Sequence, residues 1–136
     1  MIDEIHIKEM TMINYLNVFY NWKLQHTGMD MEHYDAIGET PKGKKCVMEM
    51  KFRSSHYMDM MLEKKKYDWL MEIPDVLKFY LVHDTTGTYI FWLDSLNFNS
   101  IIEMNCPETT FWGDDKKQKE IYLLPIQWAS IQIIKK

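Results

Sequence analysis

The sequence predicts an α/β (α+β) fold in which helices cover a small mixed sheet. Three observations indicate this fold. Apolar residues recur at helical spacing near the N-terminus, the segment 45–53 alternates between apolar and polar residues, and two aromatic-rich runs flank a turn at 84–87. The chain has 136 residues, 46% of them hydrophobic, so one domain over 1–136 can bury a core without disulfides.

The N-terminal segment predicts a helix over about 5–25. Its apolar residues recur at steps of three and four, and no Gly or Pro interrupts them. These residues are Ile13, Leu16, Tyr20 and Leu24. Gly28 then breaks the helix, and a short strand is expected over about 32–37.

A turn and a strongly alternating strand come next. Pro41 and Gly43 are typical of a turn, because Pro presets one backbone dihedral and Gly supplies another. The strand over 45–53 has one wholly apolar side, which should face the core. That side consists of Cys46, Met48, Met50 and Phe52, and the other side of Val47, Glu49, Lys51 and Arg53.

The second half of the chain predicts one more helix and a hairpin. Ser54 and Ser55 can cap a helix over about 56–72, which Pro74 ends. The apolar runs 76–83 and 88–93 form a hairpin around the turn at 84–87.

The C-terminal part is less regular. We expect a long polar loop over 97–119. A strand should follow over about 121–126, and Pro125 favours a place near a sheet edge. The loop contains aromatic residues and three lysines, so it can contact either a nucleic-acid backbone or a second subunit.

Charge is unevenly distributed along the chain. The net charge is −4, yet residues 42–66 carry eight bases and three acids between two acidic flanks. Such a basic stretch can hold phosphates in a protein that is acidic as a whole. The alternative is a solvated helix face together with a basic turn.

Several classes of protein are excluded by composition. No apolar run is long enough to span a bilayer, and acidic residues at the N-terminus argue against a secretory signal. Cys46 and Cys106 form no zinc-binding spacing. A cytoplasmic (intracellular) protein without membrane attachment is therefore expected.

Asp35, Glu49 and Lys51 form the group of residues that most suggests chemistry. Asp35 ends the first predicted strand, and Glu49 and Lys51 share one side of the next. Two carboxylates on neighbouring strands can hold a hard divalent cation, and a lysine beside them can orient a water molecule and pair with a phosphate. The alternative is an exposed Glu–Lys pair on a solvated strand, which contributes little stability.

This pattern resembles the PD-(D/E)xK, or restriction-endonuclease-like, nuclease superfamily. An Asp, then hydrophobic residues leading into Glu49-Met50-Lys51, and then a helix match its motif, although Tyr34 stands where the motif has Pro. The resemblance covers about 1–95 and implies an αβββαβ core, with 96–136 as a C-terminal extension.

The resemblance also implies roles for individual residues. Asp35, Glu49 and the Met50 carbonyl would hold Mg²⁺ (or Mn²⁺), and Lys51 would be the catalytic lysine. A further carboxylate from the first helix would be Glu9 or Glu4, with Glu9 preferred. A helix lysine would come from 64–66, with Lys66 preferred. Contacts to the substrate would come from Lys45, Arg53 and Lys64.

The expected function is hydrolysis of DNA phosphodiester bonds by a metal-activated water. The resemblance implies a homodimer and a small phage, mobile-element or junction-resolving type of endonuclease. Two alternatives remain. One is a non-catalytic interaction protein, such as a phage- or plasmid-type inhibitor of a host enzyme, and the other is a nucleic-acid-binding module on the same fold.

Overall fold

The computed structural model describes residues 3–27, 34–97, 102–107 and 116–135, with only the backbone described for 102–107 and 116–118. It is a mixed α+β fold with two sheets and two α-helices in these residues. The main sheet has the strand order β1-β2-β3-β5-β6-β9, and the second has the order β4-β8-β7. The main-sheet strands are β1 (Lys23–His26), β2 (Ala36–Glu39), β3 (Lys45–Phe52), β5 (Leu77–Asp84), β6 (Gly87–Trp92) and β9 (Ile131–Ile134). The other elements are α1 (Glu4–Tyr20), β4 (Asp59–Glu63), α2 (Lys64–Met71), β7 (Ile102–Pro107), β8 (Lys116–Pro125) and two 3₁₀ turns, η1 (Leu93–Ser95) and η2 (Ile126–Trp128).

Helix α1 is confirmed, but the predicted end at about residue 25 is wrong. The Asp3 side chain caps its start by accepting from the His6 amide at 3.0 Å. Asn21 ends it in the left-handed conformation with φ 63°, which Asn tolerates better than most residues. The Asn17 side chain then donates to the Leu24 carbonyl and accepts from the Leu24 amide, both at 2.9 Å. This exchange fixes the start of β1, so the chain leaves the helix earlier than its apolar periodicity suggests.

The β2–β3 hairpin is confirmed around the turn that Gly43 makes with φ 80°. The first strand is Ala36–Glu39, later than the predicted 32–37, of which 32–33 lie outside the described residues. Strand β3 begins at Lys45 as predicted and ends at Phe52. It pairs antiparallel with β2 and parallel with β5, so it is an inner strand of the sheet.

The helix predicted over 56–72 is wrong in its first half. Residues Asp59–Glu63 form β4, which pairs antiparallel with β8, and α2 spans only Lys64–Met71. Met60 and Leu62 are buried at alternate positions, as a strand requires. Pairing with the distant strand β8 makes residues 59–63 a strand. The predicted helix forms only after Glu63.

The β5–β6 hairpin is confirmed, with Asp84 paired to Gly87 at its tip. The predicted strand over 121–126 belongs to the longer β8, and its place near an edge is wrong, because β8 lies between β4 and β7. Pro125 is tolerated there since it is the last residue of the strand. Part of the predicted loop over 97–119 forms β7.

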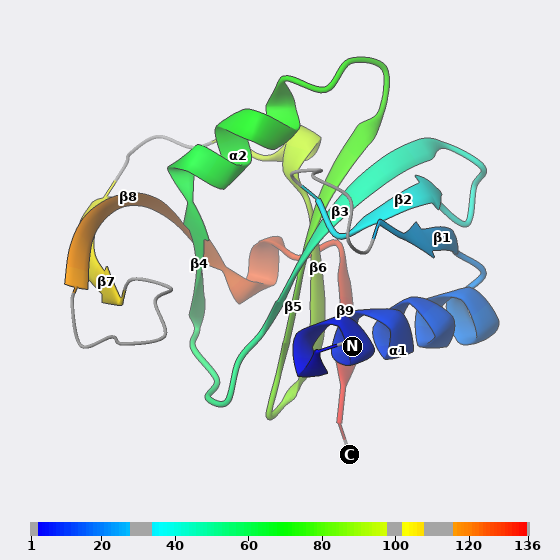
Figure 1. Cartoon of the computed structure of the whole chain (residues 1–136), viewed down its shortest axis with the longest axis horizontal. Coiled ribbons are helices and arrows are strands. Elements are labelled where there is room, and N and C mark those ends of the chain that lie inside the picture. The colour runs from blue at the N-terminus through cyan, green and yellow to red at the C-terminus, as the bar shows by residue number, and fades with distance from the viewer. Residues whose placement is uncertain (1–2, 28–33, 98–101, 108–115, 136) are drawn as a thin grey trace.

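Both faces of the main sheet are covered (Figure 1). Helix α1 packs on one face, and α2 with the second sheet covers the other. The first core includes Met12, Ile13, Leu16, Met48, Met50 and Leu81, and the second includes Val47, Met60, Leu62, Leu70, Tyr80 and Phe91. The apolar side predicted for β3 is confirmed as core, but its other side is also covered. Among the described residues, no helix combines the length and apolarity needed to cross a membrane.

Candidate active site

Three carboxylates meet beside the start of β2. Asp35 precedes β2, Glu49 lies in the middle of β3, and Glu9 lies on α1. The Asp35 amide donates to the Met48 carbonyl at 2.9 Å, and Asp35 Oδ2 accepts from the Met50 amide at 2.8 Å. The Asp35 side chain thus extends the hydrogen bonding between β2 and β3 beyond the first residue of β2.

The pKa of Asp35 is raised from 3.8 to about 7. Burial is the largest cause, and the negative charge of Glu49 adds to it. The Met50 amide opposes the shift, while Glu9 raises the pKa further through its charge and a hydrogen bond between the two carboxyl groups.

Glu9 is fixed from its other side by a histidine. His26 Nε2 lies 2.7 Å from Glu9 Oε1, and the Glu9 residue is only 6% exposed. His26 is the last residue of β1, so the helix-to-strand turn at Asn21 carries this ring over α1. The His6 ring, from the first turn of α1, meets the His26 ring edge-on at 5.5 Å between centroids.

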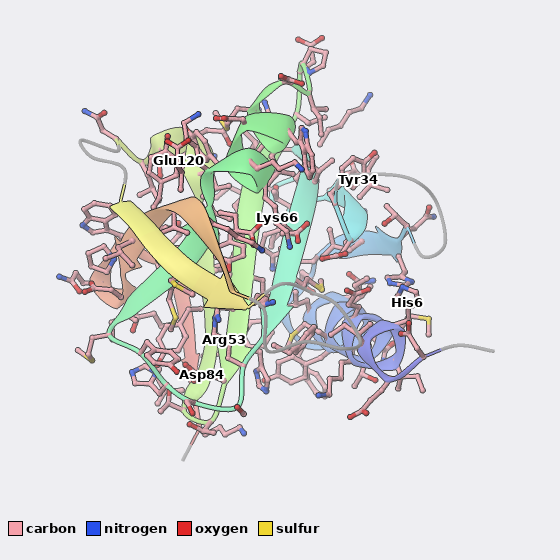
Figure 2. All side chains as sticks on the ribbon, turned by 60° about the vertical axis from the view of Figure 1, so that its left-hand side comes forward. His6, Tyr34, Arg53, Lys66, Asp84 and Glu120 are labelled. Carbon is pink, nitrogen blue, oxygen red and sulfur yellow. The ribbon has the colours of Figure 1, made fainter. Side chains whose placement is uncertain are left out.

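Glu49 is paired with a lysine of α2. Lys66 donates from Nζ to Glu49 Oε1 at 3.2 Å, and Glu49 is 8% exposed. Figure 2 shows Lys66 between α2 and β3. Burial raises the pKa of Glu49, and the Lys66 charge opposes this shift. The alternative of a fully solvated Glu–Lys pair on β3 is therefore wrong for Glu49.

Lys51 lies two residues farther along β3 and is exposed. Desolvation by the surrounding protein lowers the pKa of its amine, and the charges of Lys66 and Arg53 lower it further. The charges of Glu63 and Glu49 act in the opposite direction. An accessible amine with a lowered pKa, next to buried carboxylates, is suited to contact an anionic group.

The structure brings together most, but not all, of the predicted site residues. The residues that converge are Glu9, Asp35, Glu49, Met50, Lys51 and Lys66. Lys45 lies at the other end of β3, opposite Glu39. Lys64 pairs with Asp68 at 2.6 Å, and Glu4 lies 3.6 Å from Lys8 on the exposed side of α1. Lys65 lies over the Trp69 ring.

Arg53 lies between the carboxylate cluster and strand β4. Its charge acts on Lys51, but its Nη2 donates to the Met61 carbonyl at 3.3 Å. Tyr80 donates its hydroxyl to the same carbonyl at 2.7 Å. Arg53 Nε is buried and has no hydrogen-bond partner among the described residues. The guanidinium therefore anchors β4 to the main sheet at the border of the cluster.

Sequence reasoning named Lys119 only as one of three lysines in a loop that could contact a nucleic-acid backbone or a second subunit, and it missed His26 and Glu63 at this cluster. Lys119 donates from Nζ to Glu63 Oε1 at 2.9 Å, across 56 positions of sequence. The charges of Lys66 and Lys51 also act on Glu63. No local pattern could have indicated these residues, because the pairing of β4 with β8 and the position of β1 bring them here.

Hard divalent cations bind carboxylate oxygens, and the cluster offers such oxygens. Buried, mutually repelling carboxylates are stabilised by a cation, and Mg²⁺ commonly uses only one or two protein carboxylates together with water and phosphate oxygens. Within the described ranges, no three Asp, Glu, His or Cys side chains are arranged to hold a metal ion. A cation at Asp35 and Glu49 would therefore need water or substrate oxygens as further ligands.

A separate groove lies away from this cluster. Its volume is about 880 Å³, and it runs between α1, the β5–β6 hairpin and β9. Its apolar lining includes Ile7, Met12, Ile133 and Ile134. Its lining includes Phe52 and Arg53 next to Lys51, but none of Glu9, Asp35 and Glu49, so the groove adds nothing to the chemistry of the carboxylates.

Comparison with known proteins gave no relative. No protein-family model matches the sequence. Searches of curated proteins and of solved structures gave no significant match either.

Proposed function

We propose that this chain is a metal-dependent nuclease that hydrolyses DNA phosphodiester bonds and has a PD-(D/E)xK-type active site. The observation that carries the proposal is the meeting of Glu9, Asp35 and Glu49 with Lys51 and Lys66. These residues come from α1, the start of β2, β3 and α2. Strongly perturbed pKa values are concentrated at functional sites, and the pKa of Asp35 is raised to about 7.

The order of elements also supports the proposal. Helix α1 is followed by β1, β2 and β3, and then by α2 and β5, with β4 inserted before α2. The parallel pairing of β3 with β5 requires a crossover, which β4 and α2 supply. This order is compatible with an αβββαβ core, and the strands after it are additions.

The residues divide the chemical work between them. Asp35 and Glu49 would hold Mg²⁺ or Mn²⁺, which when bound would supply a water of lowered pKa and offset phosphate charge. Lys51 donates hydrogen bonds that orient the attacking water and stabilise the charge on the phosphate. Lys66 balances Glu49, while His26 and Glu9 keep Asp35 in place. The attacking water gives up a proton to solvent as its oxygen bonds to phosphorus, the bond to the leaving sugar oxygen breaks, and that oxygen takes a proton from solvent.

The test is a cleavage assay with supercoiled, linear and branched DNA, and with RNA, in Mg²⁺, Mn²⁺ or EDTA. We expect metal-dependent cleavage by the wild type and a loss of at least about 100-fold in Lys51→Met. Lys45→Met is the matched control, because Lys45 lies on the same strand but outside the cluster, and it should retain activity. Equal activity of wild type and Lys51→Met with metal present would refute the proposed nuclease mechanism.

Other outcomes of the same assay separate the alternatives. Binding of DNA without cleavage in any metal would favour a nucleic-acid-binding module. Neither binding nor cleavage would favour a non-catalytic interaction protein. A homodimer, which would give one site for each strand of a duplex, is part of the proposal and is tested by light scattering on the purified chain with and without DNA.

A further inference from the structure

The second sheet reaches the candidate active site through one ion pair. Lys119 of β8 donates to Glu63, the last residue of β4, at 2.9 Å. The side chains are 25% and 33% exposed, so solvent and solutes can reach both groups. Exposed ion pairs contribute only about 0–1 kcal/mol, which means that the pair can open at small cost.

Three lysine side chains, Lys119, Lys66 and Lys51, act on the single carboxylate of Glu63. The hydrogen bond and charge of Lys119, and then the charges of Lys66 and Lys51, lower the pKa of Glu63 against the effect of burial. The charges of Lys66 and Lys51 act on Glu49 as well, whereas Lys119 acts on Glu63. Such an arrangement of amines around one accessible carboxylate can also hold a phosphate group.

We propose that Glu63 fills a phosphate-binding subsite built on Lys119 beside Lys51 and Lys66, and that an incoming phosphate displaces the Glu63 carboxylate from Lys119. The ligand is a phosphate group, and its source in a nucleic-acid backbone rests on the proposed function. A neighbouring phosphate of the cleaved strand would then contact β8 as well as β3. The C-terminal half of the chain would thus contribute directly to substrate binding.

Strand β8 offers a matched control for this proposal. Glu120 follows Lys119, is exposed and points to the opposite side of the strand. Figure 2 shows Glu120 well apart from Lys66. Glu63→Gln and Glu120→Gln remove the same charge, but only the first leaves Lys119 without its carboxylate. Gln at position 63 retains the Oε1 acceptor, and thermal melts by circular dichroism check that both variants are folded.

The experiment measures binding of a fluorescein-labelled DNA duplex in EDTA over a range of NaCl concentrations. Glu63→Gln is expected to bind about 5- to 10-fold more tightly than wild type at low salt, with a salt slope steeper by roughly one unit. Lys119→Met should bind more weakly and lower the slope by about the same amount. Glu120→Gln should change affinity by less than about 2-fold, because the Glu120 side chain is exposed and solvent screens its charge.

The double variant Glu63→Gln/Lys119→Met decides the role of Lys119. It should lose the gain in affinity produced by Glu63→Gln alone. Equal gains for Glu63→Gln and Glu120→Gln, or a gain that survives removal of the Lys119 amine, would overturn the proposal. Titration with inorganic phosphate distinguishes the ligand's source: tighter phosphate binding by Glu63→Gln with unchanged DNA binding would assign the subsite to a free phosphate.

This binding assay is independent of cleavage. If the wild type cleaves DNA with metal but Glu63→Gln and Glu120→Gln bind DNA equally, the phosphate subsite is refuted and the proposed nuclease activity stands. If the variants show the predicted binding differences but the wild type cleaves DNA in no metal, the proposed nuclease activity is refuted and the phosphate subsite stands.

Discussion

Lys66 of α2 donates a 3.2 Å hydrogen bond to Glu49 of β3, across 17 positions of sequence. This bond joins the helix that crosses between two parallel strands to the buried carboxylate on the first of them. Although burial acts to lower the pKa of Lys66, the charge and hydrogen bond of Glu49 raise it, so the amine stays charged. Burial raises the pKa of Glu49, and the charge and hydrogen bond of Lys66 oppose that shift.

Lys66→Met should therefore weaken the proposed cation site without removing a ligand. Outer partners of metal ligands typically contribute about 10- to 100-fold to metal affinity or activity. We expect a loss in that range together with a higher Mg²⁺ concentration for half-maximal cleavage. Lys65→Met is the control, since Lys65 lies over Trp69 on the same helix. An unchanged Mg²⁺ requirement in Lys66→Met would show that the pair is only structural.

Asp35→Asn should stabilise the metal-free protein at neutral pH. The folded-state pKa of Asp35 is about 7 against an ordinary 3.8, so the folded state binds a proton more strongly than the unfolded state does. Stability from this group is fully present below about pH 4 and is lost as the pH rises toward 7 and above. Asn removes that loss, so the variant should exceed wild type at pH 8 by on the order of 2 kcal/mol and match it near pH 4.

Urea unfolding in EDTA at several pH values measures this difference. Asp59→Asn, which changes an exposed carboxylate of β4, controls for net charge. A constant offset between Asp35→Asn and wild type from pH 4 to pH 8 would contradict the assignment. Addition of Mn²⁺ at pH 8 should stabilise wild type more than Asp35→Asn, because the variant lacks a candidate ligand.

Asp84 should show the opposite pH dependence. Its side chain is fully buried at the tip of β5, where it accepts from His56 Nδ1, the Thr86 amide and the Thr86 hydroxyl, each at 2.8 Å. Burial alone would raise its pKa, but these hydrogen bonds lower it. Stability from Asp84 is present above the ordinary carboxyl pKa of 3.8 and is lost as the pH falls through the lower folded value.

Asp84→Asn should lower the free energy of unfolding by about 1–3 kcal/mol at pH 7, because the amide cannot accept from all three donors. The difference from wild type should shrink in acid, where wild-type Asp84 itself becomes protonated. Thermal melts at pH 7 and pH 3 test this, again with Asp59→Asn as the control. A difference that grows in acid would be inconsistent with the lowered pKa.

Gly38→Ala should destabilise the β1–β2 edge of the main sheet. A Cβ at Gly38 would overlap the Lys23 carbonyl oxygen of the neighbouring strand, so the two backbones must separate. We expect a loss of about 1–3 kcal/mol. Ile37→Thr, at the exposed preceding position, keeps a β-branched side chain and should cost less. Because β1 carries His26, the Ala variant should also lower activity; unaltered stability would show that the edge relaxes freely.

The sequence by itself determined the local elements whose side-chain periodicity matches their burial. Helix α1, the β2–β3 turn, β3 and the β5–β6 hairpin follow from apolar spacing and from turn residues such as Gly43. The same local patterns placed Asp35, Glu49 and Lys51 on neighbouring strands. Selection of Glu9 and Lys66 from their helices depended on the resemblance to a nuclease family.

Only the tertiary structure decided the features that depend on contacts distant in sequence. Residues 59–63 form a strand because β8 pairs with them, and this pairing brings Lys119 to Glu63. The burial of Glu49 and the raised pKa of Asp35 likewise depend on elements that cover the sheet. Periodicity reports which side of a segment is apolar, but desolvation and charge–charge energies depend on distances in space, and those distances exist only after the chain has folded.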